Sequence, residues 1–387
     1  MKDIHITEEM LKPLSDEKRD MEQIVFKSMP YWKEVWFRLI KNKLSLIGII
    51  TIILLFIIAI FVPFLVDYDY ADNNLYRVNI PPILDTVEDR DGNKYFINKD
   101  YRIYSIKDGT ISKQLEITKE DFMNSKTYYG EDMNIVMAYS DKSNIKYLDS
   151  NGNELVEAGK IWNKDNILGT DIFGRDLFIR LVYGARISLL VAVVATIVNL
   201  FIGTIYGGFS GYMGGRIDNF MMRLVDIIST IPLTLYVILI MVVVGAGIKS
   251  IIIALSSVYW VGMARLVRGQ VMSIKQQEFV LAAMTMGTKK KDILFKHLLP
   301  NSIGPIIVSM TMLIPQAIFV EAFLSYIGLG MPRPMASWGT LSNDAVQTLN
   351  MYPYQLIAPA VAISVTMFAF HFLGDGLRDA IDPRLRK

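Results

Sequence analysis

The sequence contains no cysteine and only three histidines, at positions 5, 297 and 371. Without cysteine there can be no disulfide, iron–sulfur cluster or thiol nucleophile. Three histidines spread along 387 residues do not make a His-rich metal site. We therefore expect this chain to bind neither a metal nor a redox cofactor.

The sequence also lacks an excess of charge of either sign. There are 40 Lys and Arg against 38 Asp and Glu, a net charge of +2, whereas nucleic-acid-binding domains are strongly basic. Charged residues make up 20% and hydrophobic residues 52%, against about 25% charged in an ordinary soluble domain. These values exclude a nucleic-acid-binding protein and disfavour a soluble enzyme.

Sequence motifs of catalysis are absent as well. The phosphate-binding pattern G-x-x-x-x-G-K-[ST] does not occur, because Gly159-Lys160 is followed by Ile161. The nucleophile elbow G-x-S-x-G and the zinc motif H-E-x-x-H are missing too. We predict that this chain is not an enzyme and has no catalytic residue.

Long apolar segments are abundant. Residues 44–66 contain no charge over 23 positions, and about 20 residues cross a hydrocarbon core as a helix. A signal peptide would have a shorter apolar core and a small-residue cleavage site, and neither is present. Two further segments meet at Gly245-Ala246-Gly247, which suits a hairpin turn. The sequence therefore predicts an all-α membrane protein with six transmembrane helices. They are expected at residues 44–66, 187–206, 231–244, 251–267, 306–327 and 356–373.

The distribution of Lys and Arg predicts the orientation, because cytoplasmic loops are enriched in both. Residues 27–43 carry five basic residues and one acidic residue, and residues 265–297 carry seven basic and two acidic ones. We therefore place both termini in the cytoplasm, as segments 1–43 and 375–387, together with a loop that carries Arg216 and Arg223. The membrane-spanning core of helices two to six would occupy residues 166–374.

A polar insertion at residues 67–165 separates the first two apolar segments, and this topology places it outside the cytoplasm. It contains the turn signals Asp91-Gly92, Asp108-Gly109 and Asn151-Gly152. Runs of strand-forming residues flank these turns at 94–97, 102–106 and 115–117. We predict an extracytoplasmic, β-rich insertion domain.

The most informative segment lies between the fourth and fifth apolar segments. Residues 278–286 favour a short helix, and Gly287 is placed to end it. Phe279, Ala282, Ala283 and Met286 recur at helical spacing and give one apolar face. Such a short helix needs a partner in water. Two interpretations stay open from the residues alone: the helix rests on its own transmembrane core or the lipid surface, or it binds another protein.

This segment resembles the cytoplasmic loop of ABC-importer permeases, whose pattern is E-A-A, three residues, Gly, nine residues, I-x-L-P. Ala282, Ala283, Gly287, Leu299 and Pro300 fall on that spacing. Leu281 stands where the pattern has Glu, and His297 stands where it has Ile.

Three further segments resemble the second, or "C"-type, permease of dipeptide and oligopeptide importers. They are residues 36–44 before the first helix, residues 168–188 with Leu168-Gly169-Thr170-Asp171 and Gly174-Arg175-Asp176, and the closing residues 373–385. The resemblance covers about residues 31–387 except the insertion.

The resemblance implies a permease that forms half of a translocation pore in a bacterial or archaeal cell membrane. Its partners would be a second permease, two cytoplasmic ABC ATPases that bind ATP and Mg, and an extracytoplasmic binding protein that delivers a peptide. The loop 265–300 would contain the ATPase-coupling helix. The implied coupling residues are Glu278, Phe279, Ala282, Ala283, Met286, Gly287, Leu299 and Pro300.

Polar residues within apolar segments are candidates for the translocation pathway, because a charge at the bilayer centre costs about 2.5–3.5 kcal/mol on insertion scales. Glu321 is the leading candidate, and Asn199 and His371 are weaker ones. The alternative for Glu321 is a hydrogen bond to a neighbouring helix or a place near the outer end. We interpret Trp338 as an anchor at the membrane interface.

Two alternatives from other classes of function remain at this point. One is a membrane-anchored sensor that reads a ligand with the external insertion, although no kinase, cyclase or coiled-coil segment follows the last helix. The other is a channel or ion-driven carrier that works without an ATPase.

Overall fold

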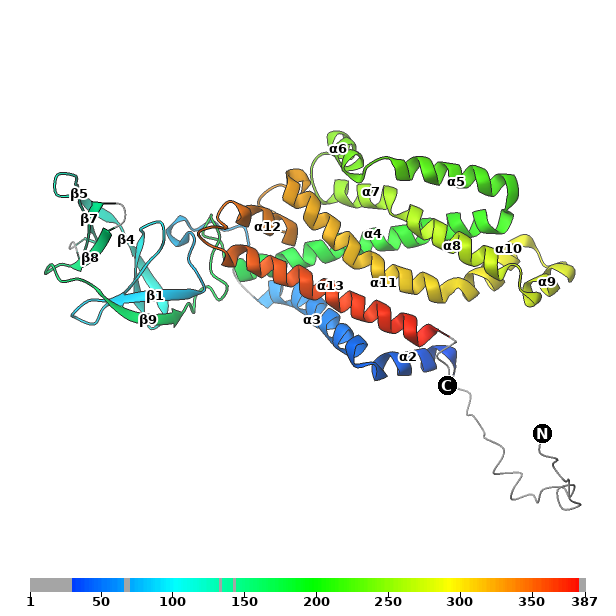
Figure 1. The fold of residues 1–387 in the computed structure, drawn as a ribbon, viewed down its shortest axis with the longest axis horizontal. Coiled ribbons are helices and arrows are strands. Elements are labelled where there is room, and N and C mark those ends of the chain that lie inside the picture. Colours follow the sequence, from blue (N-terminus) through cyan, green and yellow to red (C-terminus); the bar gives the residue numbers. More distant parts are fainter. Residues whose placement is uncertain (1–29, 66–69, 132–133, 142–143, 383–387) are drawn as a thin grey trace, which may run out of the picture.

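The computed structural model describes residues 30–65, 70–131, 134–141 and 144–382. Parts of the predicted terminal segments 1–43 and 375–387, namely residues 1–29 and 383–387, lie outside this range. So do Val66 and residues 67–69, 132–133 and 142–143 of the predicted insertion. The molecule is elongated, with a β domain at one end and a helical bundle along the rest (Figure 1).

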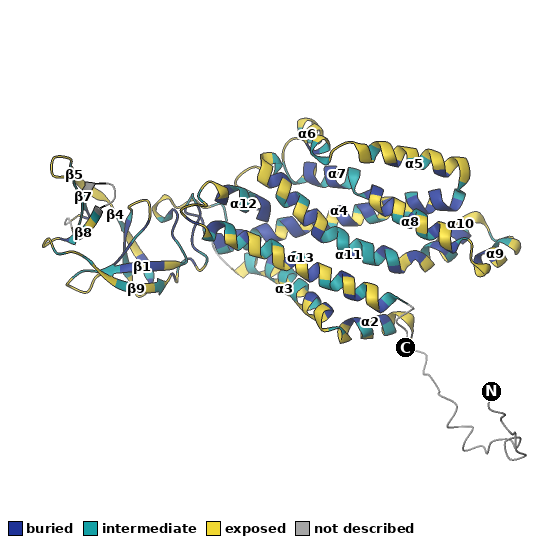
Figure 2. Cartoon of the chain, viewed as in Figure 1, coloured by how far each residue is buried: buried dark blue, intermediate teal, exposed yellow. Residues whose placement is uncertain are grey.

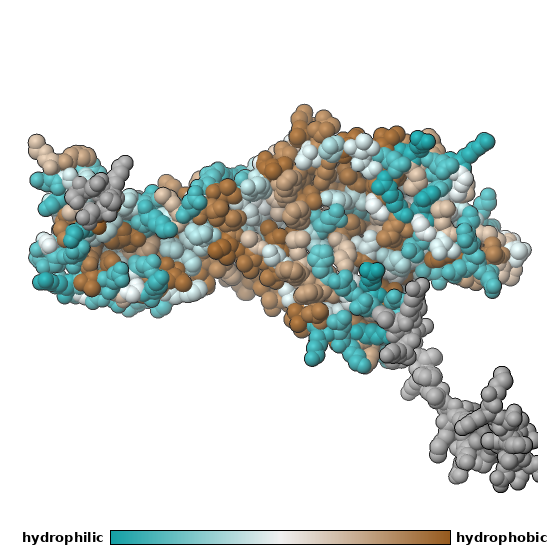
Figure 3. All heavy atoms as spheres, in the orientation of Figure 1, coloured by the Kyte–Doolittle hydropathy of each residue, from teal (hydrophilic) through white to brown (hydrophobic). Residues whose placement is uncertain are grey.

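The helical bundle contains five helices that are long and apolar enough to cross a membrane, counted over the described residues. A sixth span results if α5 and α6, which are bent by 82° at a short break, count as one. Hydrophobic residues gather over the middle of the bundle, and hydrophilic residues cover both ends of the molecule (Figure 3). The helices are α2 (Tyr31–Lys41), α3 (Lys43–Leu65), α4 (Leu177–Met213), α5 (Gly215–Thr230), α6 (Leu233–Val244), α7 (Ile248–Val258), α8 (Trp260–Ile274), α9 (Glu278–Thr285), α10 (Lys290–Asp292), the π-helical η3 (Ile293–Leu298), α11 (Leu299–Leu324), the π-helical η4 (Ser325–Leu329), α12 (Trp338–Val346) and α13 (Tyr354–Ile381).

Several helices are longer than their apolar segments. The second begins at Leu177 and ends at Met213, and the fifth span runs from Lys290 to Leu329. The sequence prediction counted only uncharged residues, whereas α4 begins with turns that carry Arg180 and Arg186, and the fifth span begins with Lys290-Lys291-Asp292. The predicted loop with Arg216 and Arg223 is wrong, because both residues lie in the amphipathic helix α5.

Helix α4 forms the centre of the bundle and packs closely against α8 (Figure 2). Gly203, Gly207 and Gly211 repeat every fourth residue on α4 and therefore share one face. A Cβ at Gly207 would lie 2.2 Å from the carbonyl oxygen of Ala264, so only glycine allows this approach. Small residues at such a spacing bring membrane helices into backbone contact.

The β domain consists of two antiparallel sheets within residues 83–162. One sheet has the order β4-β3-β2-β1-β9 and the other β5-β6-β7-β8. Asp108 and Gly109 both have positive φ, 55° and 83°, and connect β3 to β4 as the predicted two-residue turn. Of the run predicted at 115–117, Leu115 ends β4 and Ile117 begins β5, and at Glu116 between them the chain passes from one sheet to the other. The strands are β1 (Ile83–Glu88), β2 (Lys94–Ile97), β3 (Ile103–Lys107), β4 (Thr110–Leu115), β5 (Ile117–Asp121), β6 (Lys126–Tyr129), β7 (Ile135–Asp141), β8 (Asn144–Asp149) and β9 (Val156–Trp162), with a short 3₁₀ turn η2 (Leu75–Arg77) before them.

Both ends of the β domain are held against the start of α13. Ile80 and Thr170 exchange hydrogen bonds: the Ile80 N–H donates to the Thr170 hydroxyl at 2.9 Å, and the Thr170 N–H donates to the Ile80 carbonyl at 2.8 Å. The buried amide of Gln355 donates to Asn79 Oδ1 at 2.9 Å and to the Thr170 carbonyl at 3.0 Å. The β domain is therefore joined to the bundle by hydrogen bonds as well as by the chain.

Lys99 and Tyr352 extend this junction toward the β domain. The Lys99 ammonium donates to the Met351 carbonyl at 2.7 Å. Burial first, and then the Asp100 carboxylate, raise the pKa of Tyr352 above its ordinary value. The phenol of Tyr352 is therefore neutral at physiological pH.

Candidate functional site

Helix α9 lies at the end of the molecule opposite the β domain (Figure 1). It ends as the sequence predicts: Gly287 has φ +78°, the Gly287 N–H donates to the Met284 carbonyl at 3.1 Å, and the Thr288 N–H donates to the Ala283 carbonyl at 3.2 Å. This pair of bonds is a Schellman motif, in which glycine takes the left-handed position after the helix. The turn fixes the direction in which the chain leaves α9 toward α10.

The two faces of α9 differ from the predicted ones. Val280 (0% exposed) and Ala283 (4% exposed) face the interior of the chain, and Val280 belongs to a cluster with Val271, Ile293 and Leu298. The prediction that Ala283 belongs to the face offered to a partner is therefore wrong. The spacing of the four apolar residues predicted a common face. It could not show that the chain's own core would bury one of them.

The outer face of α9 keeps most of the predicted residues and adds one. Glu278, Phe279, Ala282 and Met286 are exposed, and so is Leu281, the residue that departs from the family pattern. Phe279 is 43% and Met286 79% exposed. Two large apolar side chains in solvent on an eight-residue helix, with a third at Met286 directly after it, are unusual for a free surface and typical of a docking site.

Leu299 and Pro300 open helix α11, which follows the π-helical turn η3 without a break. Leu299 is half-buried next to Gly208 of α4, where an added Cβ would lie 3.1 Å from the leucine side chain. Pro300 lies in the first turn of α11 and, having no backbone N–H, cannot donate a hydrogen bond to the preceding turn η3. The motif therefore places a leucine against the core and a proline at the surface.

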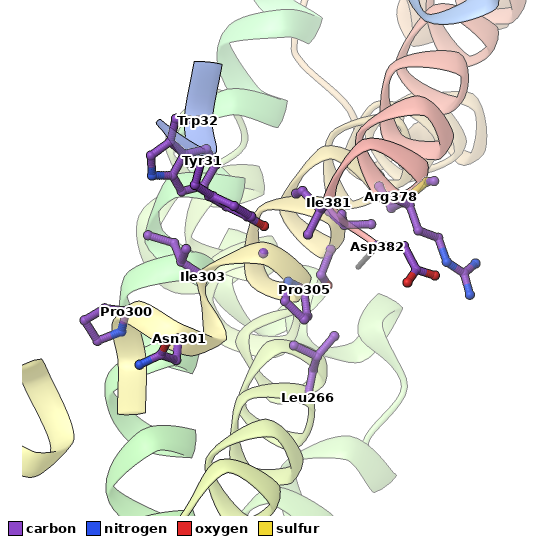
Figure 4. A pocket seen from close by; sticks show the side chains of 14 residues that line it. Tyr31, Trp32, Leu266, Pro300, Asn301, Ile303, Pro305, Arg378, Ile381 and Asp382 are labelled. Atoms are coloured by element: carbon purple, nitrogen blue, oxygen red, sulfur yellow. The ribbon is translucent and has the colours of Figure 1, made fainter. Parts of the chain in front are cut away.

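Pro300 also borders a cleft of about 960 Å³ between α2, α8, α11 and α13. Figure 4 shows Tyr31, Trp32, Ile303 and Ile381 among the side chains that line it. None of the three pathway candidates lines this cleft.

Glu321 of α11 is fully enclosed between helices. Its carboxylate accepts hydrogen bonds from the Ser188 hydroxyl of α4 at 2.8 Å and from the Ser325 hydroxyl at 2.9 Å. The Ser188 hydroxyl also accepts a hydrogen bond from the backbone N–H of Trp338 at 3.3 Å, which connects α12 to the same group. In this conformation Glu321 joins α11 to α4 and, through Ser188, to α12, and its side chain is fully buried.

The structure does not bring Asn199 and His371 to Glu321. Asn199 is buried on α4 with its Oδ1 unpaired among the described groups, 11 residues or about 16 Å along the helix from Ser188. His371 is exposed on α13. Trp338 is buried, with its indole N–H donating to the Leu181 carbonyl at 3.1 Å, so its prediction as an interface anchor is wrong.

Sequence reasoning missed a group of buried charges at the start of α4. Asp171 accepts from Arg175 Nε at 2.8 Å and from Arg180 Nη1 at 2.5 Å. Asp344 of α12 lies within 3.4 Å of Arg175 and 3.5 Å of Arg180, and it accepts from Arg333 at 2.8 Å. The sequence contained a signal, because Asp171 and Arg175 belong to the motif before the second helix, but their distant partner could not be read from it.

No group of three or more His, Asp or Glu side chains in the described part of the chain is arranged to hold a metal ion.

Family comparisons define the class of protein. Residues 200–387 match the family model described as the binding-protein-dependent transport system inner membrane component. Residues 30–82 match the N-terminal transmembrane domain of oligopeptide transport permease C.

Relatives extend the match over the whole chain. The chain is 39% identical to the oligopeptide transport system permease protein OppC of Bacillus subtilis (strain 168), over 99% of both chains. It is 38% identical to the dipeptide transport system permease protein DppC of the same organism, over 97% of this chain and 92% of that one. It is 37% identical to the DppC protein of Lactococcus lactis subsp. cremoris (strain MG1363), over 94% and 93%. The chain belongs to the oligopeptide and dipeptide permeases of ABC importers, which are multi-pass membrane proteins.

Proposed function

We propose that this chain is a permease subunit that forms half of the translocation pore of an ATP-driven peptide importer. The observation that carries the proposal is the similarity to oligopeptide and dipeptide permeases over nearly the full length, including the insertion. The helices fit the six-span fold of type I importer permeases when the bent pair α5–α6 counts as one span.

The positions of the elements along the molecule support an orientation in the membrane. Helix α9, the start of α2 and the end of α13 lie at one end, and the β domain lies at the other (Figure 1). Basic residues of the connection 265–297 belong to the α9 end, which favours the cytoplasm there. Both termini would then be cytoplasmic and the β domain extracytoplasmic, in a bacterial or archaeal cell membrane.

The second permease would cover apolar helix surface that this chain leaves open. Amphipathic α5 buries only Asp218 and Val225 in its own chain, while Phe220, Leu224 and Ile227 are exposed. Lipid would cover the remaining apolar surface.

On the cytoplasmic side, the outer face of α9 would lie in a groove of an ABC ATPase. This ATPase would be one of two such subunits in the importer. ATP and Mg would bind to these subunits and not to this chain, which would have no catalytic role. Movement of the ATPases would act through α9 on the core cluster around Val280 and so bias the pore between its two states.

On the extracytoplasmic side, the β domain would contact the binding protein that delivers the peptide. The turn between β5 and β6 presents Phe122 (77% exposed) and Met123 (98% exposed). Asp121 holds this turn by accepting from the Asn124 N–H at 3.1 Å and from the Asn124 side-chain amide at 2.8 Å. Two apolar side chains on a fixed turn suit docking to another protein.

A growth assay tests the function. Cells that need one amino acid and receive it only as a tripeptide should stop growing when this chain is deleted, and should still grow on the free amino acid. Normal growth on the tripeptide would contradict peptide import. If the chain were a sensor, a separate peptide importer expressed constitutively would still take up the tripeptide after the deletion.

A further inference from the structure

A groove in the β domain runs between the strand β4 and the short turn η2. It consists of two pockets of about 690 Å³ and 320 Å³, which share the lining residues Tyr76, Gln114 and Glu116. On the β4 side the lining follows the chain without a gap from Ile111 to Ile117. At about 3.4 Å per residue, this stretch is about 20 Å long. The groove is therefore long enough for an extended peptide of about six residues.

Hydrogen bonds hold η2 in place as the opposite wall of the groove. Arg102 donates to the Leu75 carbonyl at 2.8 Å. Arg77 donates to the Ile111 carbonyl at 3.3 Å and pairs with Asp165 at 3.2 Å. Because these contacts are made within the chain, a ligand does not have to order the wall when it binds.

Strand β4 presents an open edge to this groove. In its sheet β4 pairs only with β3, and no strand of the described residues pairs with its outer edge. Asp165 closes the edge at one end, where it accepts from the Ile111 N–H at 3.2 Å. An open strand edge is a template for a further strand, and several peptide-binding domains add an extended peptide in this way.

Two buried polar atoms in the lining have no hydrogen-bond partner among the described residues. They are Oε1 of Gln114 and the hydroxyl of Tyr104, a fully buried residue of the smaller pocket. Buried polar groups are nearly always paired in native proteins, and a peptide offers a donor and an acceptor at each residue. Water can pair with both atoms too, so the choice of ligand rests on the open edge and on the charge.

The charges of the larger pocket favour a cationic group. Three carboxylates and one guanidinium line it, those of Asp100, Glu116, Glu120 and Arg102. Such an excess attracts an ammonium group and repels polyanions such as nucleic acids. Tyr76, which is 63% exposed, adds apolar surface to both pockets.

We propose that this groove binds an extended segment of the incoming peptide as an added strand along β4, with the N-terminal ammonium of the peptide at the larger pocket. This inference rests on the proposed function, which places the β domain on the side from which the peptide arrives. Pairing through the backbone does not depend on side chains, so it suits a class of solutes that share only their backbone. A longer peptide pairs with more of the edge, and the groove therefore favours hexapeptides over tripeptides.

The experiment measures peptide binding to the complex of both permeases and both ATPases in nanodiscs, without the binding protein. The probe is hexaalanine with a fluorescein-labelled lysine at its C-terminus, and the readout is fluorescence anisotropy. We expect saturable binding that is about tenfold weaker in Tyr76→Ala, a usual cost of truncating an aromatic anchor. Trp162→Ala is the control and should bind as the wild type does, because Trp162 is similarly exposed, at 55%, but lies on β9 at the other edge of the same sheet.

Changes in the probe test the contacts without altering the protein. Methylation of the four central amide nitrogens removes backbone donors and should weaken binding about tenfold. Acetylation of the N-terminus removes its charge and should weaken binding about threefold. A probe with three alanines in place of six should also bind about tenfold more weakly, since it pairs with about half of the edge.

Equal binding by the wild type and Tyr76→Ala would overturn the proposal, as would equal losses in Tyr76→Ala and Trp162→Ala. Undiminished binding of the methylated probe would overturn it too, because the peptide would then not pair with β4. Uptake of a tripeptide by the same complex with its binding protein tests the proposed function separately. Uptake without any binding of the hexaalanine probe would refute the groove and leave peptide import standing, whereas probe binding without uptake would support the groove and contradict peptide import.

Discussion

Replacing Phe279 by alanine should weaken the binding of this permease to its ATPase. Phe279 is 43% exposed, and a phenylalanine side chain offers about 200 Å² of surface. A groove that covers the exposed part would bury about 90 Å² more, worth about 2 kcal/mol at 25 cal/mol per Å². That free energy corresponds to about a thirtyfold change in the dissociation constant. As the affinity for the ATPase falls, the stimulation of ATP hydrolysis by the loaded binding protein should fall too.

The assay measures ATPase binding and stimulated ATP hydrolysis on purified complexes in detergent or nanodiscs. Phe368→Ala is the control, because Phe368 is equally bulky and, at 61%, more exposed than Phe279, but lies on the bundle surface of α13. Ala283→Asp is not a suitable variant, since it would place a charge inside the permease's own core. Normal binding and normal stimulation with Phe279→Ala would refute the argument that the outer face of α9 is the docking site.

Three other changes give separate tests. Gly287→Val should reduce coupling, because β-branched residues disfavour φ +78° by roughly 1–2 kcal/mol, and Gly287→Asn should retain it; equal coupling in stimulated ATPase assays would contradict the role of the turn. Replacing residues 84–161 by Gly-Ser-Gly should leave assembly intact, since Ile83 pairs with Trp162, but should weaken binding-protein docking about tenfold; unchanged affinity would show that the β domain is a passive cap. Glu321→Gln should keep uptake within about threefold, because the serine hydroxyls can reorient, whereas Glu321→Leu should lower the yield of assembled complex; complete loss of uptake in a fully assembled Glu321→Gln complex would assign Glu321 to the pathway.

Local features of the fold could be predicted from the sequence. The uncharged run 44–66 and the turn at Asp108-Gly109 follow from rules that act over a few residues. The full lengths of α4 and of the span 290–329 could not be predicted, because both helices begin with turns that carry charged residues, which a search for uncharged segments leaves out. The helical state of the segment with Arg216 and Arg223 was missed for the same reason.

The candidate site divides in a similar way. Gly287 could be identified as the end of α9, since a left-handed glycine is a local requirement. The burial of Ala283 could not, because it depends on the distant residues that pack around Val280. The partnership of Asp344 with Arg180 spans 164 positions in the chain, and no periodicity or spacing in the sequence connects them.

The central claim is that this chain is an essential half of an ATP-driven peptide pore. The most direct test is uptake of a radiolabelled tripeptide into proteoliposomes that contain the second permease, both ATPases and the binding protein, with and without this chain. Our account predicts uptake that requires ATP, the loaded binding protein and this chain together. Uptake that continues without this chain, or that proceeds with it in the absence of any ATPase, would contradict the account.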